Sequence, residues 1–172
     1  MRTGIIGSGT VGKTLASAFT AEGHEVMIGT RDTTKDDLKK FSEENKIALG
    51  TFQETAAFGE LLVICTKGDA AMNALGMAGA GNLSFKVIID TTNPIAPKPP
   101  ENGVLHFTTT LERSLMEDLQ QEFPEAKFVK AFNSVGSAAM YKPQFSGIKP
   151  SMFICGNDEK AKQITTDILT AF

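Results

Sequence analysis

The sequence has no tryptophan, a single tyrosine and only two cysteines among its 172 residues. So few cysteines cannot form the disulfide framework on which many small secreted domains depend. Cys65 and Cys155 each end an apolar run, so we expect two reduced core thiols in preference to a disulfide or redox pair. His24 and His106 are isolated, and no group of histidines and cysteines has the spacing of a metal site.

An excess of positive charge and long hydrophobic runs are also missing. The chain has 17 Lys and Arg against 20 Asp and Glu, a formal charge of −3, which is a poor match to a nucleic acid. No run of 18 apolar residues is present to span a bilayer, and the N-terminus lacks the pattern of a signal peptide. We therefore expect a cytoplasmic protein with neither a nucleic acid nor a membrane as partner.

Short apolar runs alternate with helical patterns along the chain. Strands are expected over residues 4–6, 25–28, 46–49, 61–65, 86–90, 127–131 and 151–155. Helices are expected over residues 10–22, 35–45, 53–58, 69–80, 111–123 and 158–172, with a proline-rich loop over 91–102. This alternation predicts an α/β fold, a doubly wound and mostly parallel sheet that occupies residues 1–172 as a single domain. Such sheets bind ligands at the carboxyl ends of their strands.

A glycine-rich turn follows the first expected strand. Residues 7–12 read GSGTVG, match the GxGxxG pattern and open a helix, which is the context that a dinucleotide site requires. Gly7 permits a tight turn, Gly9 lets a pyrophosphate approach the backbone, and Gly12 lets the helix pack on the strand. Free backbone N–H groups at the helix start would bind the phosphates. The pattern predicts a Rossmann-type NAD(P)-binding domain, the alternative being a glycine turn without a ligand.

The end of the second expected strand favours NADP over NAD. An NAD site usually has an acidic residue at this point, whereas residues 29–32 read GTRD and place Asp32 beyond the strand. Arg31 can pair with a 2′-phosphate through two N–H groups, Thr30 can donate its hydroxyl, and Lys35 can add a second positive charge. The alternative for Arg31 and Lys35 is a solvated surface charge.

Several segments together resemble one known family. Residues 4–32, GIIGSGTVGKTLASAFTAEGHEVMIGTRD, resemble the start of the NADP oxidoreductases that use the deazaflavin coenzyme F420. The segments LLVICTK, VIIDTTNP, KFVKAFNSVG and MFICGND extend the resemblance over nearly the whole chain. Related domains occur in membrane ferric reductases. Family members usually continue into C-terminal helices that form a dimer and close the substrate pocket. We expect this extension to be absent here.

The resemblance implies a role for each matching residue. Ser8, Gly9, Thr10 and Val11 match the pyrophosphate loop, and Thr30, Arg31 and Lys35 match the positions around the 2′-phosphate. Thr66, Lys67, Thr92, Asn93 and Pro94 match the residues under the nicotinamide half, and Ala131, Phe132 and Asn133 match the opposite wall. Judged by residue type alone, Lys67 is equally a solvated lysine. In the same way, Asn93 is equally a turn residue before Pro94, and Asn133 is equally a residue that satisfies loop backbone.

No constellation for acid–base or nucleophilic catalysis stands out. Hydride transfer between a nicotinamide and a flavin-like ring needs little side-chain chemistry, because the two cofactors carry the reaction. We therefore expect an NADPH-binding oxidoreductase with a small-molecule redox acceptor, namely coenzyme F420, FMN or FAD, and the resemblance allows a homodimer. The alternatives are an NADP-dependent dehydrogenase of a small carbonyl or imine and a non-catalytic dinucleotide-binding module. We expect Met72, Met77 and Met140 to fill the core.

Overall fold

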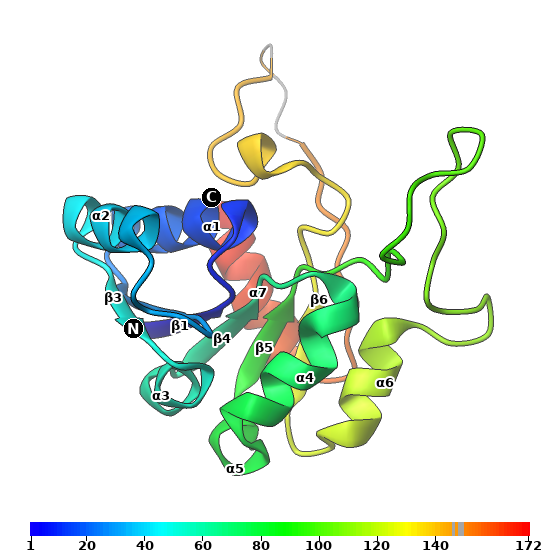
Figure 1. Cartoon of the computed structure of the whole chain (residues 1–172), viewed down its shortest axis with the longest axis horizontal. Helices are drawn as coiled ribbons and strands as arrows, with labels where there is room; N and C mark the ends of the chain where they lie inside the picture. Colours follow the sequence, from blue (N-terminus) through cyan, green and yellow to red (C-terminus); the bar gives the residue numbers. More distant parts are fainter. Residues whose placement is uncertain (146, 148–149) are drawn as a thin grey trace.

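The structure is a computed structural model that describes residues 1–145, 147 and 150–172. Its described part contains a six-stranded, all-parallel sheet with the strand order β3-β2-β1-β4-β5-β6 (Figure 1). The strands are β1 (Arg2–Ile6), β2 (Glu25–Gly29), β3 (Ala48–Gly50), β4 (Leu61–Ile64), β5 (Val87–Asp90) and β6 (Lys127–Lys130). The strand order reverses between β1 and β4, so the predicted doubly wound sheet is confirmed.

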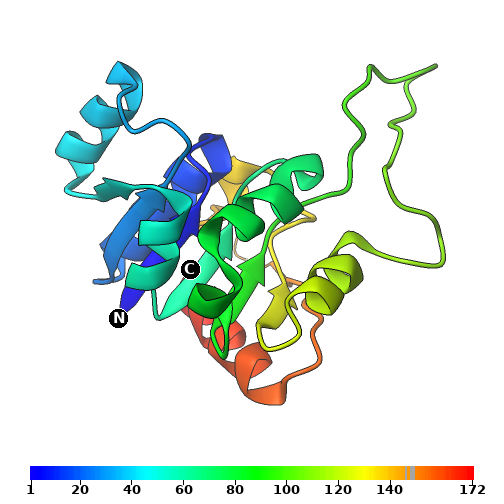
Figure 2. The same ribbon diagram turned by 60° about the horizontal axis from the view of Figure 1, so that its bottom comes forward.

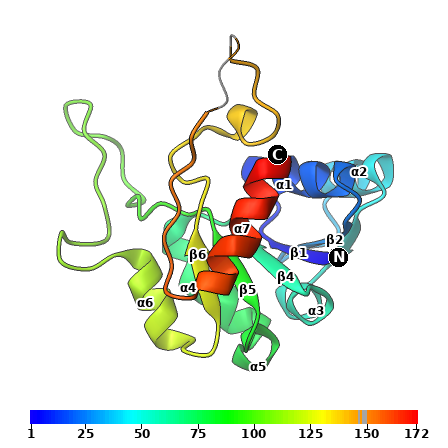
Figure 3. The same ribbon diagram turned by 180° about the vertical axis from the view of Figure 1, so that it is seen from behind.

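Helices cover both faces of this sheet (Figures 1 and 3). They are α1 (Thr10–Ala21), α2 (Asp36–Asn45), α3 (Phe52–Phe58), α4 (Gly68–Ala78), α5 (Ala80–Leu83), α6 (Leu115–Glu122), the 3-10 turn η1 (Ser137–Ala139) and α7 (Glu159–Ala171). α1 and α7 supply side chains to one hydrophobic cluster, and α3, α4 and α6 supply side chains to the other. The sheet is therefore the middle of three layers.

The central strands alternate between these two clusters. Ile5 and Val63 pack toward α1 and α7, whereas Ile6 and Ile64 pack toward α3 and α4. All four residues of β4 are buried, as expected for a strand covered on both faces. Among the described residues, no helix is long and apolar enough to cross a membrane.

The strand predicted over 151–155 is not formed. A single antiparallel bridge joins Cys155 to Lys130 at the end of β6. Met152 and Ile154 pack against the core, but Phe153 is 83% exposed and Cys155 is exposed. The prediction that Cys155 lies in the core was therefore wrong, because this segment has only one side against the protein.

The other cysteine, Cys65, follows the prediction, and the methionines follow it in part. Cys65 is free and buried, and burial raises the pKa of its thiol to about 12. Met140 is buried and Met72 packs against the core, whereas Met77 is 50% exposed, contrary to prediction. The buried side of α4 is occupied by the alanines Ala71, Ala74 and Ala78, and Met77 is not on that side.

The chain between β5 and α6 forms a protrusion from the body (Figure 2), here called the arm (residues 95–113). Isolated bridges between Ile95 and Phe107, and between Glu101 and Val104, hold its two halves together. The prediction of a structured loop over 91–102 is confirmed. The predicted helix 111–123 begins only at Leu115, because Ser114 and Glu117 form a capping box there.

Candidate functional site

The glycine turn between β1 and α1 needs two of its glycines for steric reasons. Gly7 has a φ of +124°, and its N–H donates to the Gly29 carbonyl oxygen at 3.0 Å. A Cβ on Gly12 would lie 2.0 Å from the Gly7 carbonyl oxygen. The turn therefore holds α1 directly against the end of β1.

Gly9 is different, because a Cβ there would meet no protein atom within 4 Å. Gly9 is the N-cap of α1, and this helix has neither a side-chain cap nor an acidic residue in its first turn. By contrast, α3 and α6 have complete capping boxes. The first N–H groups of α1 thus have no side-chain cap, and the space beside Gly9 at the positive end of the helix is open. This geometry fits a bound phosphate.

The remaining residues of this loop lie around that opening. Ser8 is half-buried and its Oγ donates to Thr30 Oγ1 at 3.2 Å. Thr10 is exposed, and Val11 packs partly against the core. Thr30 is 6% exposed, and its N–H donates to the Gly50 carbonyl oxygen at 2.9 Å. The loop after β1 and the end of β2 are therefore directly joined.

Two cations follow β2. Arg31 and Lys35 are both exposed, and within the described ranges no carboxylate lies within 4.0 Å of either side chain. Asp32 turns instead to Thr34, whose hydroxyl and N–H donate to its Oδ1 at 2.6 and 2.9 Å. These hydrogen bonds lower the pKa of Asp32. The two cations are free to bind an anion, and the Asp32 carboxylate is engaged elsewhere.

The end of β4 contributes Thr66, Lys67 and Gly68. Thr66 Oγ1 is buried and has no hydrogen-bond partner among the described residues, whereas Lys67 is exposed at the N-cap of α4. A Cβ on Gly68 would lie 2.1 Å from the Asn93 carbonyl oxygen. Sequence reasoning did not single out Gly68, although its position directly after a strand and at the start of a helix was a usable signal.

The ends of β5 and β6 are joined by Asn93 and Asn133, here called the asparagine pair. Asn93 Nδ2 donates to the Asn133 carbonyl oxygen at 2.8 Å, and Asn133 Nδ2 donates to Asn93 Oδ1 at 3.4 Å. Both residues and Pro94 are half-buried. Thr92 is 3% exposed and Ala131 is 0% exposed. Thr92 and Ala131 are therefore buried, although Thr92 still contributes to the lining of a cleft described below.

Sequence reasoning also missed a buried ion pair at this edge. Lys130 Nζ donates to Asp90 Oδ2 at 2.6 Å and to the Thr92 carbonyl oxygen at 2.9 Å. Asp90 Oδ1 accepts the N–H and hydroxyl of Thr92 at 2.8 and 2.7 Å. Asp90 and Lys130 are register partners in neighbouring strands, so their side chains point to the same face. The sequence offered a signal for this pair, because Asp90 and Lys130 end two strands that were predicted to be parallel.

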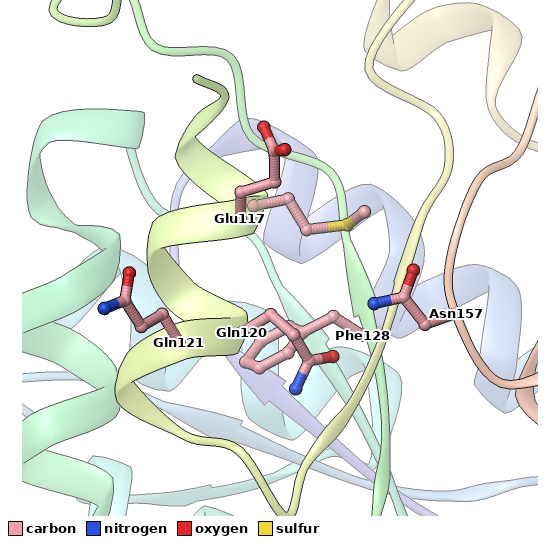
Figure 4. A pocket seen from close by; sticks show the side chains of 6 residues that line it. Glu117, Gln120, Gln121, Phe128 and Asn157 are labelled. Atoms are coloured by element: carbon pink, nitrogen blue, oxygen red, sulfur yellow. The ribbon is translucent and has the colours of Figure 1, made fainter. Parts of the chain in front are cut away.

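Two hollows lie on the α6 side of the molecule. The larger, here called the strand-end cleft, has a volume of about 450 Å³ and is lined by Thr92, Asn93, Pro94, Lys130, Asn133 and residues 109–117. The smaller, of about 280 Å³, lies between α6 and Asn157 (Figure 4). Only the strand-end cleft contains residues that the sequence predicted for the site. Because all described strands are parallel, these residues share one edge with the glycine turn.

Comparison with known proteins then identifies the family. The family model "NADP oxidoreductase coenzyme F420-dependent" matches residues 2–94. The chain belongs to this family. It is therefore an NADP-dependent oxidoreductase of Rossmann fold, which confirms the expected family, fold class and enzyme class.

Two solved structures are similar to this chain. The "putative F420 dependent NADP-reductase" from Arthrobacter sp. FB24 is 35% identical, with a TM-score of 0.90 over 99% of this chain and 79% of that chain. The Plasmodium falciparum pyrroline carboxylate reductase, solved with NADP bound, shares the fold at 16% identity, with a TM-score of 0.63 over 99% of this chain and 54% of that chain.

A curated relative is much longer. The metalloreductase STEAP3 of Rattus norvegicus is 26% identical over 171 residues, which are 99% of this chain and 32% of that protein. The chain thus spans about a third of the length of this relative.

Proposed function

We propose that the chain transfers a hydride between NADP(H) and a deazaflavin or flavin acceptor. The observation that carries this proposal is the uncapped start of α1 at Gly9, where a Cβ would meet no protein atom, together with the two exposed cations Arg31 and Lys35 that follow β2. The family supports the NADP part. The 35% identity to a protein named as an F420-dependent NADP-reductase supports the acceptor part.

The phosphates would be held by the chain in two places. The backbone N–H groups of Gly9, Thr10 and Val11 would bind the pyrophosphate, with Ser8 hydrogen-bonded to Thr30 beside them. Arg31 and Lys35 would bind the 2′-phosphate, which is the group that distinguishes NADPH from NADH. Asp32 does not compete, because its carboxylate accepts hydrogen bonds from Thr34.

The nicotinamide half would lie on the ends of β4, β5 and β6. Lys67 and Gly68 approach from β4, and the asparagine pair approaches from β5 and β6. Reduced NADP supplies the hydride, and the residues here orient the two rings and exclude water. No proton transfer by a side chain is required at the reacting carbon, in agreement with the half-buried, neutral amides found at this place.

The test is steady-state oxidation of NADPH with separate acceptors: coenzyme F420, FMN, FAD and ferric citrate. Turnover with a deazaflavin or flavin, and loss of that turnover in Gly9→Ala, is the expected result. The Gly9→Ala protein is also the control for a contaminating reductase, because a contaminant would be equally active in both preparations. NADPH binding without turnover of any acceptor would overturn the proposal in favour of a binding module. Turnover of a small carbonyl or imine alone would indicate a dehydrogenase.

A homodimer is part of the same proposal. The arm presents exposed apolar side chains, among them Phe107 and Leu111, at 58% and 107% relative exposure. Sedimentation equilibrium of the full chain would give a dimer mass if this expectation is correct and a monomer mass if it is not.

A further inference from the structure

The strand-end cleft lies where a second ring would meet the nicotinamide. Asn93, Pro94 and Asn133 form one side of it, and residues 109–117 form the other. Its volume of about 450 Å³ falls within the range of small-ligand sites. It is lined by two acidic side chains, Glu112 and Glu117, and by two basic ones, Arg113 and Lys130. The cleft therefore has no net excess of positive charge for a polyanion.

Lys130 is the charged residue of the cleft whose ion-pair partner is fully buried. Only 16% of its side chain is exposed, and its counterion Asp90 is fully buried. Arg113, by contrast, is 52% exposed and pairs with Asp118. An ammonium has three N–H groups, and the structure uses two, on Asp90 Oδ2 and the Thr92 carbonyl oxygen. Lys130 lines the cleft, and the third N–H has no acceptor among the described residues.

We propose that Lys130 is a specificity-determining residue of the acceptor site, and that the cleft takes a neutral conjugated ring bearing a carbonyl oxygen. This inference rests on the proposed function. A neutral carbonyl oxygen can accept a hydrogen bond from the third N–H. An anionic ligand would need an additional positive charge in the cleft, whereas a neutral ring does not. A flavin or deazaflavin ring has such oxygens, whereas an anionic ferric chelate does not match a cleft of balanced charge.

Lys130 would favour the reduced acceptor because the reaction adds negative charge to the acceptor ring. The C–H bond of the reduced nicotinamide breaks, and both of its electrons leave with the hydrogen to form a new bond on the acceptor ring. NADPH is thereby oxidised to NADP⁺, and the acceptor ring gains one negative charge, spread onto its carbonyl oxygens, until water supplies a proton. A fixed ammonium beside that oxygen binds the reduced anion more strongly than the oxidised ring.

The decisive experiment compares the two redox states of the acceptor in two matched variants. Lys130→Met removes the ammonium at the end of β6. Lys127→Met makes the same substitution at the start of β6, where Lys127 pairs with Asp158 at 3.1 Å. Dissociation constants are measured anaerobically for FMN and for 5-deaza-FMN, each in its oxidised and its reduced state. The pH is above neutral, where the oxidised rings are neutral and the reduced rings are anions. NADPH affinity and steady-state constants are measured alongside.

For Lys130→Met, we expect the preference for the reduced over the oxidised acceptor to fall roughly 10- to 100-fold, the range for one lost charge-assisted hydrogen bond. kcat/KM for the acceptor should fall similarly, and NADPH affinity should change less than about threefold. Lys127→Met should leave all values near wild type, and Lys130→Arg should recover part of the preference. Equal weakening of both redox states would overturn the inference, since it would mean that Lys130 only holds Thr92 in place.

Three further outcomes can be distinguished. If Lys130→Met does not fold, Lys130→Gln replaces it, because an amide can still donate to Asp90 and Thr92 while lacking the charge; the same fall in preference is expected, and its absence overturns the inference. If the wild type turns over an acceptor and Lys130→Met does so equally well, the inference fails and the proposed function stands. If the wild type neither binds nor turns over either acceptor, both fail.

Discussion

At the scale of the residue, the proposed preference for NADPH over NADH rests on Arg31. This residue is exposed directly after β2, in a part of the described chain where no carboxylate neutralises it. Arg31→Ala should weaken NADPH binding by about 1.5–3 kcal/mol, or roughly 10- to 100-fold, and leave NADH binding nearly unchanged. Isothermal titration with each cofactor measures this. Lys40→Ala, an exposed lysine of α2 that pairs with Glu44, is the matched control. Equal losses for both cofactors would contradict the role of Arg31.

His24 makes stability depend on pH. Its Nδ1 lies 2.7 Å from Thr3 Oγ1, and desolvation, followed by repulsion from the N-terminal ammonium, lowers its pKa below 6.5. The unfolded chain then binds a proton more readily than the folded chain, so stability is lost as pH falls through about 6.5. Between about pH 7.5 and 5.5, urea midpoints of the wild type should fall more than those of His24→Gln. Identical pH slopes in the two proteins would refute this assignment.

Single residues were predictable where local chemistry alone decides them. Gly7, Gly9 and Gly12 could be assigned distinct roles because each role follows from backbone geometry within one turn, and the contacts of each glycine agree with it. Cys155 could not be placed, because its burial depends on whether a second element covers its segment. That information lies in the packing of β6 and not in the run of apolar residues.

At the scale of the element, the glycine turn offers a test that separates binding from folding. Gly12→Ala should destabilise the protein by about 3 kcal/mol or more, because its Cβ would lie 2.0 Å from a backbone oxygen. Gly9→Ala should change the free energy of unfolding by less than about 1 kcal/mol, since its φ of −75° suits alanine and its Cβ meets no protein atom.

NADPH affinity gives the other half of this test. Gly9→Ala should still lose at least roughly tenfold in NADPH affinity, because the methyl group enters the space proposed for the pyrophosphate. Urea unfolding and cofactor titration of both variants check the two halves. Normal NADPH binding by a folded Gly9→Ala protein would remove the turn from the proposed site.

Most elements were predicted within a few residues, and two segments are exceptions. The helix predicted to start at 111 begins at Leu115 because a capping box ends the arm there. The strand predicted over 151–155 forms only one bridge, with Phe153 facing outward. In both segments the apolar pattern is broken by something other than its own period, a capping box in the first and the lack of a pairing strand in the second, and periodicity reports neither.

At the scale of the whole molecule, parallel topology assembles the candidate site. The glycine turn, Arg31 and the asparagine pair come from loops far apart in sequence, and they share an edge because every described strand runs in the same direction. That much followed from the predicted fold. The Asp90–Lys130 pair did not, because it depends on the register of β5 against β6, which no single strand encodes.

Cofactor binding should therefore stabilise the whole chain, since the site draws on five of the six strand ends. A ligand at 100 times its dissociation constant adds about 2.7 kcal/mol to the free energy of unfolding. For a chain of this length that corresponds to a rise in Tm of about 5 to 11 °C. Scanning calorimetry should show this rise with NADPH, a smaller one with equimolar NADH, and at most about half of it for NADPH with Gly9→Ala, because that variant binds NADPH at least roughly tenfold more weakly. An equal rise with NADPH and NADH would mean that the site does not read the 2′-phosphate, whatever the individual residues suggest.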